Sequence, residues 1–450
     1  MNARAVRRLP KDPGVSGWSA ILPEPPPAQP LTDEITADWL VIGGGFAGLA
    51  AARRLAHLRG GERIVLLEAG KIGEGPAGRN SGFMIDLPHK LTSEDYAGAA
   101  EQDRVQTAMN RAAIDFAADA AQEYGLSAEA FARPGKVNGA ATQRGLDANR
   151  SYAAHLEGLG EPHELLDARA MRALTGSDYY LGGLFTPGAA LIHPAMFVRG
   201  LAAGLAPKVA IHEMSPVTEV ARVGADWRAR TPIGAVTAPR IVLAVNGHAE
   251  SFGYFRRRLV HVHLYASMTR ALREDEIEAL GGERRWGVTP SDPMGSTVRR
   301  ISGTGGDRIV MRNRVTYDPD RESPESRLSR IGRTHDETLT ARFPQLEGIA
   351  MDYRWGGRLC LSLNDVPAFG ELEEGVFSAC CQNGLGVTKG TISGVLAAEL
   401  ATGKGDRANA PLLAQMLAFP PPRALPPEPI AWLGAVATLK WKEWRAGRER

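Results

Sequence analysis

The sequence predicts an α/β fold in which a Rossmann-like unit is combined with an α+β unit built on an antiparallel sheet. Three observations support this prediction. A buried strand, a glycine-rich turn, a helix and a second buried strand follow one another over residues 38–68. A second strand, turn and helix occupy residues 376–401. Between them, residues 256–317 alternate as antiparallel strands do, with a charged helix near residues 273–280.

Composition and charge limit the classes of protein that the chain can represent. Its 450 residues are 44% hydrophobic and 23% charged, typical of a folded protein with two or three structural units. The formal net charge is only +2, so no general attraction to nucleic acid follows. The cysteines Cys360, Cys380 and Cys381 build no disulfide framework, which favours a reducing compartment.

Two further features concern location. No apolar run approaches the roughly 18 residues of a membrane span. The segment Met1–Pro13 is basic but is not followed by the apolar stretch of a secretory signal. We therefore expect a cytoplasmic protein. Residues 1–36 are rich in proline from Pro23 to Pro30, which predicts an extended arm that drapes over the body.

The first chemical motif is Gly43-x-Gly45-x-x-Gly48, placed between a buried strand and a helix. Its glycines permit a tight turn, close approach of the backbone to a pyrophosphate, and close packing of helix on strand. The helix N-terminus offers free N–H groups to phosphates. Glu68 ends the next strand 20 residues after Gly48, where a carboxylate accepts hydrogen bonds from an adenosine ribose. Its charge disfavours a 2′-phosphate, so NADP is not expected.

Two more glycine-rich segments extend the site. Residues 73–82 form a loop soon after Glu68, which suits an extended cofactor, with Arg79 available for phosphate charge. Residues 380–388 lie between a strand and a helix, and the N-terminus of that helix suits the electron-rich end of a flavin. Adjacent Cys380 and Cys381 are interpreted as small packing residues, because neighbouring cysteines rarely bridge without strain.

In this order the motifs resemble the FAD-dependent D-amino-acid oxidase superfamily. The resemblance spans roughly residues 37–403 and is to the amine-oxidising branch, which includes gamma-glutamylputrescine oxidoreductase, sarcosine oxidase and glycine oxidase. It is carried by Asp38–Glu68, Gly-Arg-Asn-Ser-Gly at 78–82, Leu191-Ile192-His193-Pro194, Ile241–Gly247, Arg308–Met311, Phe343–Leu346, Trp355-Gly356-Gly357 and Asn383–Val387.

The resemblance implies an architecture and a cofactor. We expect a Rossmann-like, two-dinucleotide-binding FAD domain from residues 37–98, 182–252 and 345–405. Residues 99–181 and 253–344 would form the inserted α+β substrate domain, on an antiparallel sheet. The residues expected to bind FAD are Gly43, Gly45, Phe46, Ala47, Gly48, Glu68, Ala69, Arg79, Asn80, Ser81, Gly82, Val217, Gly384, Leu385, Gly386, Val387 and Thr388.

The implied reaction is oxidation of a C–N bond in a small amine or amino acid, with hydride transfer to flavin N5 and an imine or keto product. No general base can be named. An arginine fork is the expected clamp for a substrate carboxylate. The candidates are Arg299, Arg300, Arg312, Arg314 and Arg358, with Arg312 and Arg358 ranked first. His248 is placed near the cofactor by analogy. No cluster has metal-ligand spacing, so no metal is expected.

Departures from the family leave the electron acceptor open. Leu385 stands where relatives have a histidine, and the strand that carries an oxygen-activating lysine in some relatives reads Val310-Met311. Oxygen and a different electron acceptor therefore both stay open as alternatives. Cys360 lies near the position of a flavin-linking cysteine in some relatives, about two residues out of register.

Two alternative functions share these motifs. One is a flavin-dependent 2-hydroxy-acid dehydrogenase, which needs a similar pocket. The other is a non-catalytic FAD-binding subunit that uses its termini for docking. The tail at 406–450 ends in a helix rich in tryptophan and basic residues. Its composition is compatible with a membrane surface, but we expect it to dock on the protein body or on a partner subunit.

Overall fold

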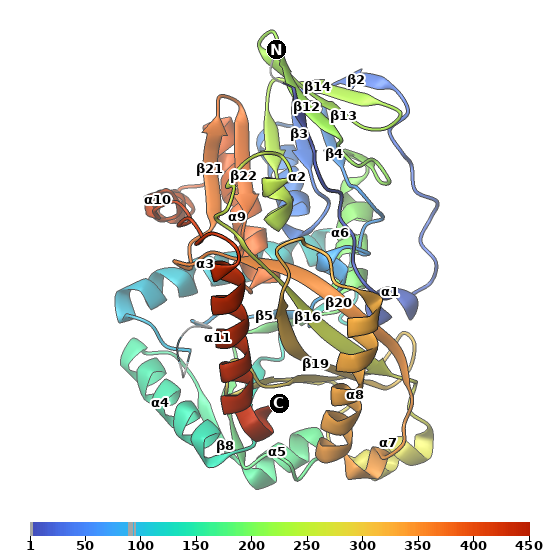
Figure 1. The fold of residues 1–450 in the computed structure, drawn as a ribbon, viewed down its shortest axis with the longest axis vertical. Coiled ribbons are helices and arrows are strands. Elements are labelled where there is room, and N and C mark those ends of the chain that lie inside the picture. Colours follow the sequence, from blue (N-terminus) through green and yellow to red (C-terminus); the bar gives the residue numbers. More distant parts are fainter. Residues whose placement is uncertain (1–2, 89–92, 94–95) are drawn as a thin grey trace.

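The structure is a computed structural model that describes residues 3–88, 93 and 96–450. Figure 1 shows two stacked bodies, a parallel sheet with its covering layers above and an eight-stranded sheet below. The parallel sheet has the order β11 (Ala210–His212), β4 (Ile64–Leu67), β3 (Trp39–Ile42), β15 (Ile241–Leu243), β22 (Val376–Cys380) and β21 (Ala368–Glu373). Only β21 runs antiparallel to its neighbour.

The central strands are buried on both faces because a layer covers each side. On one face, Val41, Leu66 and Val242 pack against helices. These are α2 (Phe46–Leu58), α3 (Ala100–Glu123), α6 (Pro194–Leu205) and α9 (Gly386–Thr402). His193 caps the N-terminus of α6, because its ring accepts a hydrogen bond from Met196 N at 3.2 Å.

On the other face, Leu40, Val65 and Leu243 pack against a five-stranded sheet. Its order is β1 (Arg4–Ala5), β12 (Glu219–Val223), β13 (Asp226–Arg230), β14 (Ala235–Ala238) and β2 (Glu34–Thr36). The N-terminal arm therefore supplies both edge strands of this sheet, β1 and β2. The prediction of an extended arm that drapes over the body did not include these strands, because two- and three-residue strands have no sequence pattern of their own.

The second body is built on the eight-stranded sheet. Its order is β20 (Met351–Leu361), β16 (Val260–Thr269), β19 (Arg308–Tyr317), β18 (Thr297–Ile301), β17 (Trp286–Pro290), β7 (Lys136–Ala140), β9 (Gly182–Thr186) and β8 (Glu164–Asp167). All neighbours are antiparallel except β17 and β7. One face packs on α5 (Ala168–Thr175), α7 (Glu274–Leu280) and α8 (Glu325–Arg342), and the other faces the parallel sheet.

The remaining elements are short or peripheral. The strands β5 (Phe83–Met84), β10 (Ala190–Ile192) and β6 (Phe131–Ala132) form a small fourth sheet. The other helices are α1 (Gly17–Ala20), α4 (Gln143–Leu159), α10 (Ala410–Ala418) and α11 (Ile430–Ala446). Short 3-10 helices are η1 (Pro76–Gly78), η2 (Asn246–Glu250), η3 (Pro344–Leu346) and η4 (Gly447–Glu449). Within the described part of the chain, no helix has both the length and the apolar character that crossing a membrane requires.

The predicted α/β class is confirmed, with a Rossmann-like sheet and a second unit on a mainly antiparallel sheet. The domain boundaries stay a prediction. Strands β9 and β20 fall in ranges assigned to the FAD domain, yet both pair within the eight-stranded sheet. Local sequence patterns identify a strand but not the strand that it pairs with. They therefore place the boundaries between such domains poorly.

The packing of α2 on α9 generates a prediction about stability. A Cβ added at Gly394 of α9 would lie 2.0 Å from the carbonyl oxygen of Ala47 in α2. We expect Gly394→Ala to lower the free energy of unfolding by about 1–3 kcal/mol through overpacking. The matched control is Gly158→Ala in α4, where no atom lies within 4 Å of the added Cβ. It should leave stability unchanged or raise it by up to about 1 kcal/mol. Equal changes in the free energy of unfolding for the two variants, measured with denaturant, would contradict the importance of the close contact at Gly394.

Candidate active site

A large cavity lies where the carboxyl ends of the parallel strands face the eight-stranded sheet. The ends of β3 and β4 contribute Ile42 and Leu67, and the segments after β15 and β22 contribute Ala244 and Gln382. The opposite wall comes from β16, β19 and β20. Open α/β sheets bind ligands at this edge, so the topology places the cavity where a ligand site is expected.

The first glycine turn has the geometry that its motif predicts. Gly43 has φ +107°, and a Cβ there would lie 2.5 Å from the carbonyl oxygen of Ala244. A Cβ at Gly48 would lie 1.7 Å from the carbonyl oxygen of Gly43. Gly45 begins α2 without a side-chain cap, and Gly45, Phe46 and Ala47 line the cavity. The first N–H groups of α2 therefore remain available to an anion.

Glu68 lies beside this turn and is held by the backbone. Its Oε2 accepts a hydrogen bond from Gly44 N at 2.6 Å, and its Oε1 accepts one from Gly70 N at 3.0 Å. Burial raises the pKa of Glu68, and these backbone N–H groups act in the opposite direction. A carboxylate has about four acceptor positions, so capacity remains for ligand hydroxyls.

The loop at 73–82 uses its polar groups differently from the expectation. Arg79 Nη1 donates to the carbonyl oxygens of Gly14 at 2.9 Å and Gly356 at 3.1 Å, while its Nε donates to Glu74 O at 2.6 Å. The guanidinium thus joins the arm, the loop and β20. Arg79 still lines the cavity, and burial lowers its pKa. A role in phosphate binding stays a prediction.

The turn before α9 forms the far end of this wall. Asn383 and Gly384 have φ +48° and +88°. Helix α9 begins after Leu385 without a side-chain cap, and Gly384 and Gly386 line the cavity. Within the described residues, the buried hydroxyl of Thr388 has no hydrogen-bond partner. A second helix N-terminus therefore opens on the same cavity as α2.

Most of the predicted cofactor residues are brought together here. Those that line the cavity are Gly43, Gly45, Phe46, Ala47, Glu68, Ala69, Arg79, Asn80, Ser81, Val217, Gly384 and Gly386. Those outside its lining are Gly48, Gly82, Leu385, Val387 and Thr388. Gly48 and Gly82 are tightly packed against neighbouring backbone, and Leu385 packs on Phe83 and Leu191.

The five candidate arginines differ in whether they line the cavity. Arg299 donates to Ile192 O at 2.7 Å and Ser81 O at 3.0 Å, and burial lowers its pKa to about 9. Arg300 is paired with Asp307 and Arg314 with Glu443. Only Arg312 and Arg358 of these five line the cavity.

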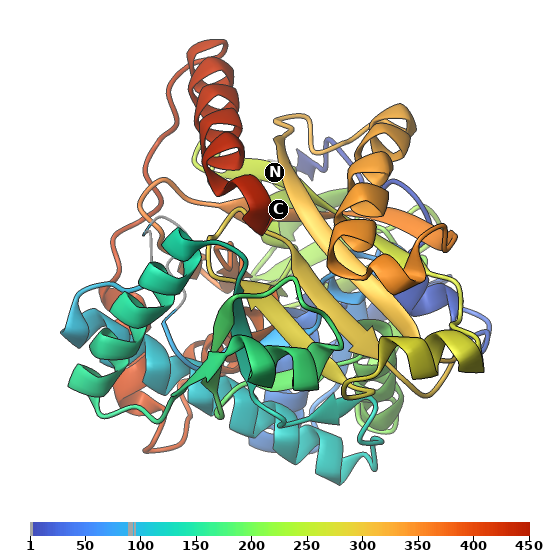
Figure 2. The ribbon, with the colours of Figure 1, turned by 90° about the horizontal axis from the view of Figure 1, so that it is seen from below.

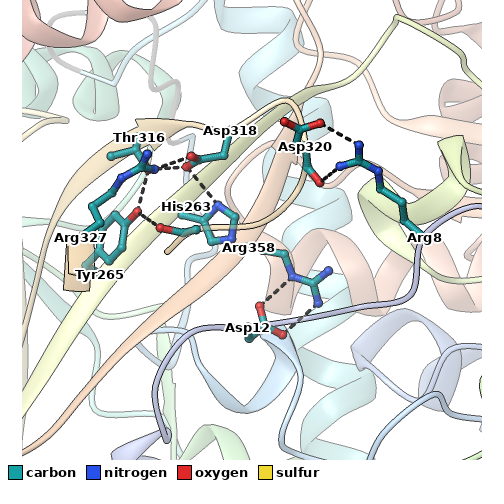
Figure 3. A network of polar contacts seen from close by, with 10 residues as sticks. Arg8, Asp12, His263, Tyr265, Thr316, Asp318, Asp320, Arg327 and Arg358 are labelled. Atoms are coloured by element: carbon teal, nitrogen blue, oxygen red, sulfur yellow. Dashed lines mark hydrogen bonds and ion pairs between the residues drawn. The ribbon is translucent and has the colours of Figure 1, made fainter. Parts of the chain in front are cut away.

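Arg312 and Arg358 differ in how they are paired. Arg312 Nη2 donates to Thr297 Oγ1 at 2.9 Å, the one hydrogen bond of its side chain among the described residues. Arg358 instead forms a two-pronged pair with Asp12, with Nε to Oδ1 at 2.7 Å and Nη2 to Oδ2 at 2.9 Å (Figure 3). Arg358 Nη1 also contacts His248 Nε2. Burial and this guanidinium hold the pKa of His248 well below its usual value.

Sequence reasoning missed the part of the arm that lines the cavity. Val6, Arg8, Leu9 and Pro10 contribute to its wall, and Gly356 N donates to Pro13 O at 2.9 Å. Asp12 is separated from Arg358 by 346 positions, so no local pattern signals their pairing. Arg8 pairs with Asp320 at the surface, as Figure 3 shows.

A neighbouring polar network is also drawn in Figure 3. His263 Nδ1 lies 3.2 Å from Asp318 Oδ2, and Arg327 pairs with the same carboxylate. Tyr265 Oη lies 2.8 Å from Thr316 Oγ1. These contacts join β16 to β19 and to the segment that follows it, while the buried Nε2 of His263 has no hydrogen-bond partner among the described residues.

Comparisons with known proteins agree with this geometry. Residues 38–400 match the family described as FAD dependent oxidoreductase. The chain is 28% identical over 398 residues to gamma-glutamylputrescine oxidoreductase of Escherichia coli, covering 85% of this chain and 88% of that protein. It is 25% identical over 387 residues to the probable oxidoreductase OrdL of Haemophilus influenzae, covering 84% and 86%.

Solved structures show the same fold. Glycine oxidase from Geobacillus kaustophilus superposes with a TM-score of 0.67 at 20% identity, covering 84% of this chain and 98% of that one. L-proline dehydrogenase from P. horikoshii superposes with a TM-score of 0.64 at 18% identity, covering 84% and 96%.

The fold and the cavity thus define a dinucleotide-dependent oxidoreductase. The chain belongs to the FAD-dependent oxidoreductase family, whose match covers most of its length. The predicted enzyme class, the FAD cofactor and the resemblance to the amine-oxidising branch are confirmed.

The Asp12–Arg358 pair generates a prediction about the arm. Both side chains are less than a tenth exposed, at 7% and 9%. Because Asp12→Ala leaves a buried guanidinium unpaired, we expect it to lower the free energy of unfolding by about 3–5 kcal/mol. Asp320→Ala breaks the exposed pair with Arg8 on the same arm and should cost less than about 1 kcal/mol. Denaturant unfolding of both variants measures the difference. Similar losses of unfolding free energy would show that the buried pair contributes no more stability than the exposed pair.

Proposed function

We propose that the cavity binds FAD along the wall that carries the glycine motifs. Glu68 would accept hydrogen bonds from the adenosine ribose, and the N-terminus of α2 would face the pyrophosphate. The turn at Gly384–Gly386 would face the isoalloxazine, where α9 would add positive potential. Support comes from the two uncapped helix ends that open on one cavity.

We further propose that the enzyme oxidises the C–N bond of a small amine or amino acid. A flavin bound here would supply the acceptor, at its N5, for a hydride from the carbon next to nitrogen. The opposite wall at Leu264, Tyr265 and Ala266 is largely apolar. An apolar wall excludes water and lowers the pKa of a substrate ammonium group, which leaves the amine neutral and able to lose hydride. The relatives named for glycine oxidase and gamma-glutamylputrescine oxidoreductase support this substrate class.

Arg312 is the proposed clamp for a substrate carboxylate. It lines the cavity and has donors to spare, while Arg358 is already matched to Asp12. Burial without a carboxylate partner lowers the pKa of Arg312. Binding of an anionic substrate would therefore stabilise the charged form of this guanidinium. His248 and Arg358 would then shape the cavity wall near the arm rather than hold the carboxylate.

The direct test is the visible spectrum of the purified protein during anaerobic addition of substrates. We expect a bound flavin that bleaches with a small amine or amino acid, and whose colour returns when oxygen or another acceptor is added. Bleaching by 2-hydroxy acids alone would favour the dehydrogenase alternative. A flavin that neither class reduces would favour the non-catalytic alternative, and a colourless protein that takes up no flavin would contradict the cofactor assignment.

Substitution of Arg312 tests whether this side chain holds the substrate carboxylate. Charge-assisted hydrogen bonds contribute about 1.5–3 kcal/mol each, so Arg312→Gln should lower kcat/KM for a carboxylate-bearing amine by about 10- to 100-fold. Amines without a carboxylate should be affected little. The matched control is Arg314→Gln on the same strand, whose side chain pairs with Glu443 outside the cavity. Equal losses for both substrate types would contradict the clamp.

A further inference from the structure

Arg299 of β18 is a buried cation that no described carboxylate neutralises. It is only 7% exposed, and none of the ion pairs in the described part of the chain includes it. Burial and the positive charge of Arg285 lower the pKa of Arg299 to about 9, so it stays charged at neutral pH. A buried charge normally has a partner of opposite charge, because removing it from water is costly. The unmatched charge of Arg299 therefore calls for a functional explanation.

Neutral groups surround the guanidinium. Its Nη1 donates to Ile192 O at 2.7 Å and to Ser81 O at 3.0 Å. Its central carbon lies 5.3 Å from the ring centre of Trp18 and 5.7 Å from that of Phe83. Trp18 belongs to α1 of the N-terminal arm, whose blue segments lie behind the strands of the eight-stranded sheet in Figure 2. Carbonyl dipoles and ring faces stabilise a cation without cancelling its charge.

The histidine beside this cluster adds no charge. The rings of His193 and Trp18 meet edge to face, with their centres 5.0 Å apart. Burial and the charge of Arg299 lower the pKa of His193 to about 3. The imidazole is therefore neutral at physiological pH, and of these three stacked side chains only Arg299 is charged.

The guanidinium lies directly behind the loop at 73–82. Ser81 lines the cavity and its carbonyl oxygen accepts a hydrogen bond from Arg299, whereas Arg299 itself is not part of the cavity wall. A Cβ added at Gly82 would lie 2.2 Å from Arg299 Nη1, so the guanidinium packs closely on the loop. Arg299 does not reach a ligand in the cavity. Its field acts through the loop, because screening is weak in a buried region.

We propose that Arg299 is a positioning residue with a second, electrostatic role. It holds the loop at Ser81 and Gly82, and its unmatched charge favours the reduced form of the flavin. This inference rests on the proposed placement of FAD along the loop. A flavin gains negative charge on reduction, and nearby positive charge stabilises that form. At an effective dielectric constant of about 20, a unit charge about 10 Å away changes an equilibrium constant by roughly tenfold.

The test is the midpoint potential of the bound flavin, measured at pH 6 in equilibrium with a dye of known potential. We expect Arg299→Gln and Arg299→Met to shift the equilibrium toward the oxidised flavin by about tenfold. For two electrons this lowers the midpoint potential by about 30 mV. Arg299→Lys loses the fork but keeps the charge at this pH, so the potential should change by less than about half as much.

A matched control is Arg300→Gln, which removes the same charge from the next residue of β18. Side chains of successive strand residues point to opposite faces of a sheet, and Arg300 is already paired with Asp307. The potential of this variant should equal that of the unmodified protein.

Three results would overturn the electrostatic role: neutral variants that keep the potential of the unmodified protein, a lysine variant that falls as far as they do, or a control that falls equally. Loss of flavin from all three Arg299 variants would show that the fork only holds the loop, and would overturn it as well. The proposed function fails in a different way. A flavin that dithionite reduces but no amine reduces would contradict the substrate class and leave the measured potentials valid.

Discussion

The close packing of α2 on α9 is the constraint on which the rest of the structure depends. Gly390 and Gly394 of α9 face Phe46 and Ala47 of α2, and larger residues at Gly394 would meet backbone. This contact brings two helix N-termini to one cavity, and neither has a side-chain cap. Two positive helix ends side by side repel each other, and a bound anion relieves that repulsion. The dinucleotide that we propose for this cavity would reach from one helix end to the other and relieve the repulsion at both.

The N-terminal arm completes the enzyme around that cavity. It supplies β1 and β2 to the five-stranded sheet and crosses the cavity wall between them. The Asp12 carboxylate neutralises Arg358, and Arg79 donates to the carbonyl oxygens of the same segment. The arm therefore changes the electrostatics of the site as well as its shape. Of the two predicted clamp arginines in the cavity, it leaves Arg312 with spare donors, which is why we assign the substrate carboxylate to that residue.

Local patterns predicted the parts of the site that arise from contiguous residues. The turn at Gly43–Gly48, the acid at Glu68 and the turn at Gly384–Gly386 were found because a strand, a glycine turn and a helix N-terminus are adjacent in the chain. The pairing of Asp12 with Arg358 could not be found, because it joins distant segments. Arg79 was assigned to phosphate from its charge alone, because the carbonyl groups of Gly14 and Gly356 that surround it come from distant segments that no local pattern indicates. Likewise, a helical pattern predicted α11 but not the contact of Glu428 with Tyr317 that holds its start on the protein body.

The most direct measurement of the central claim is an experimental structure of the purified protein with its flavin. The account predicts pyrophosphate oxygens within about 3 Å of the N–H groups in the first turn of α2, with the ribose on Glu68 and the isoalloxazine against Gly384–Gly386. A flavin bound elsewhere, or a cavity closed by the arm with no room for the dinucleotide, would contradict it.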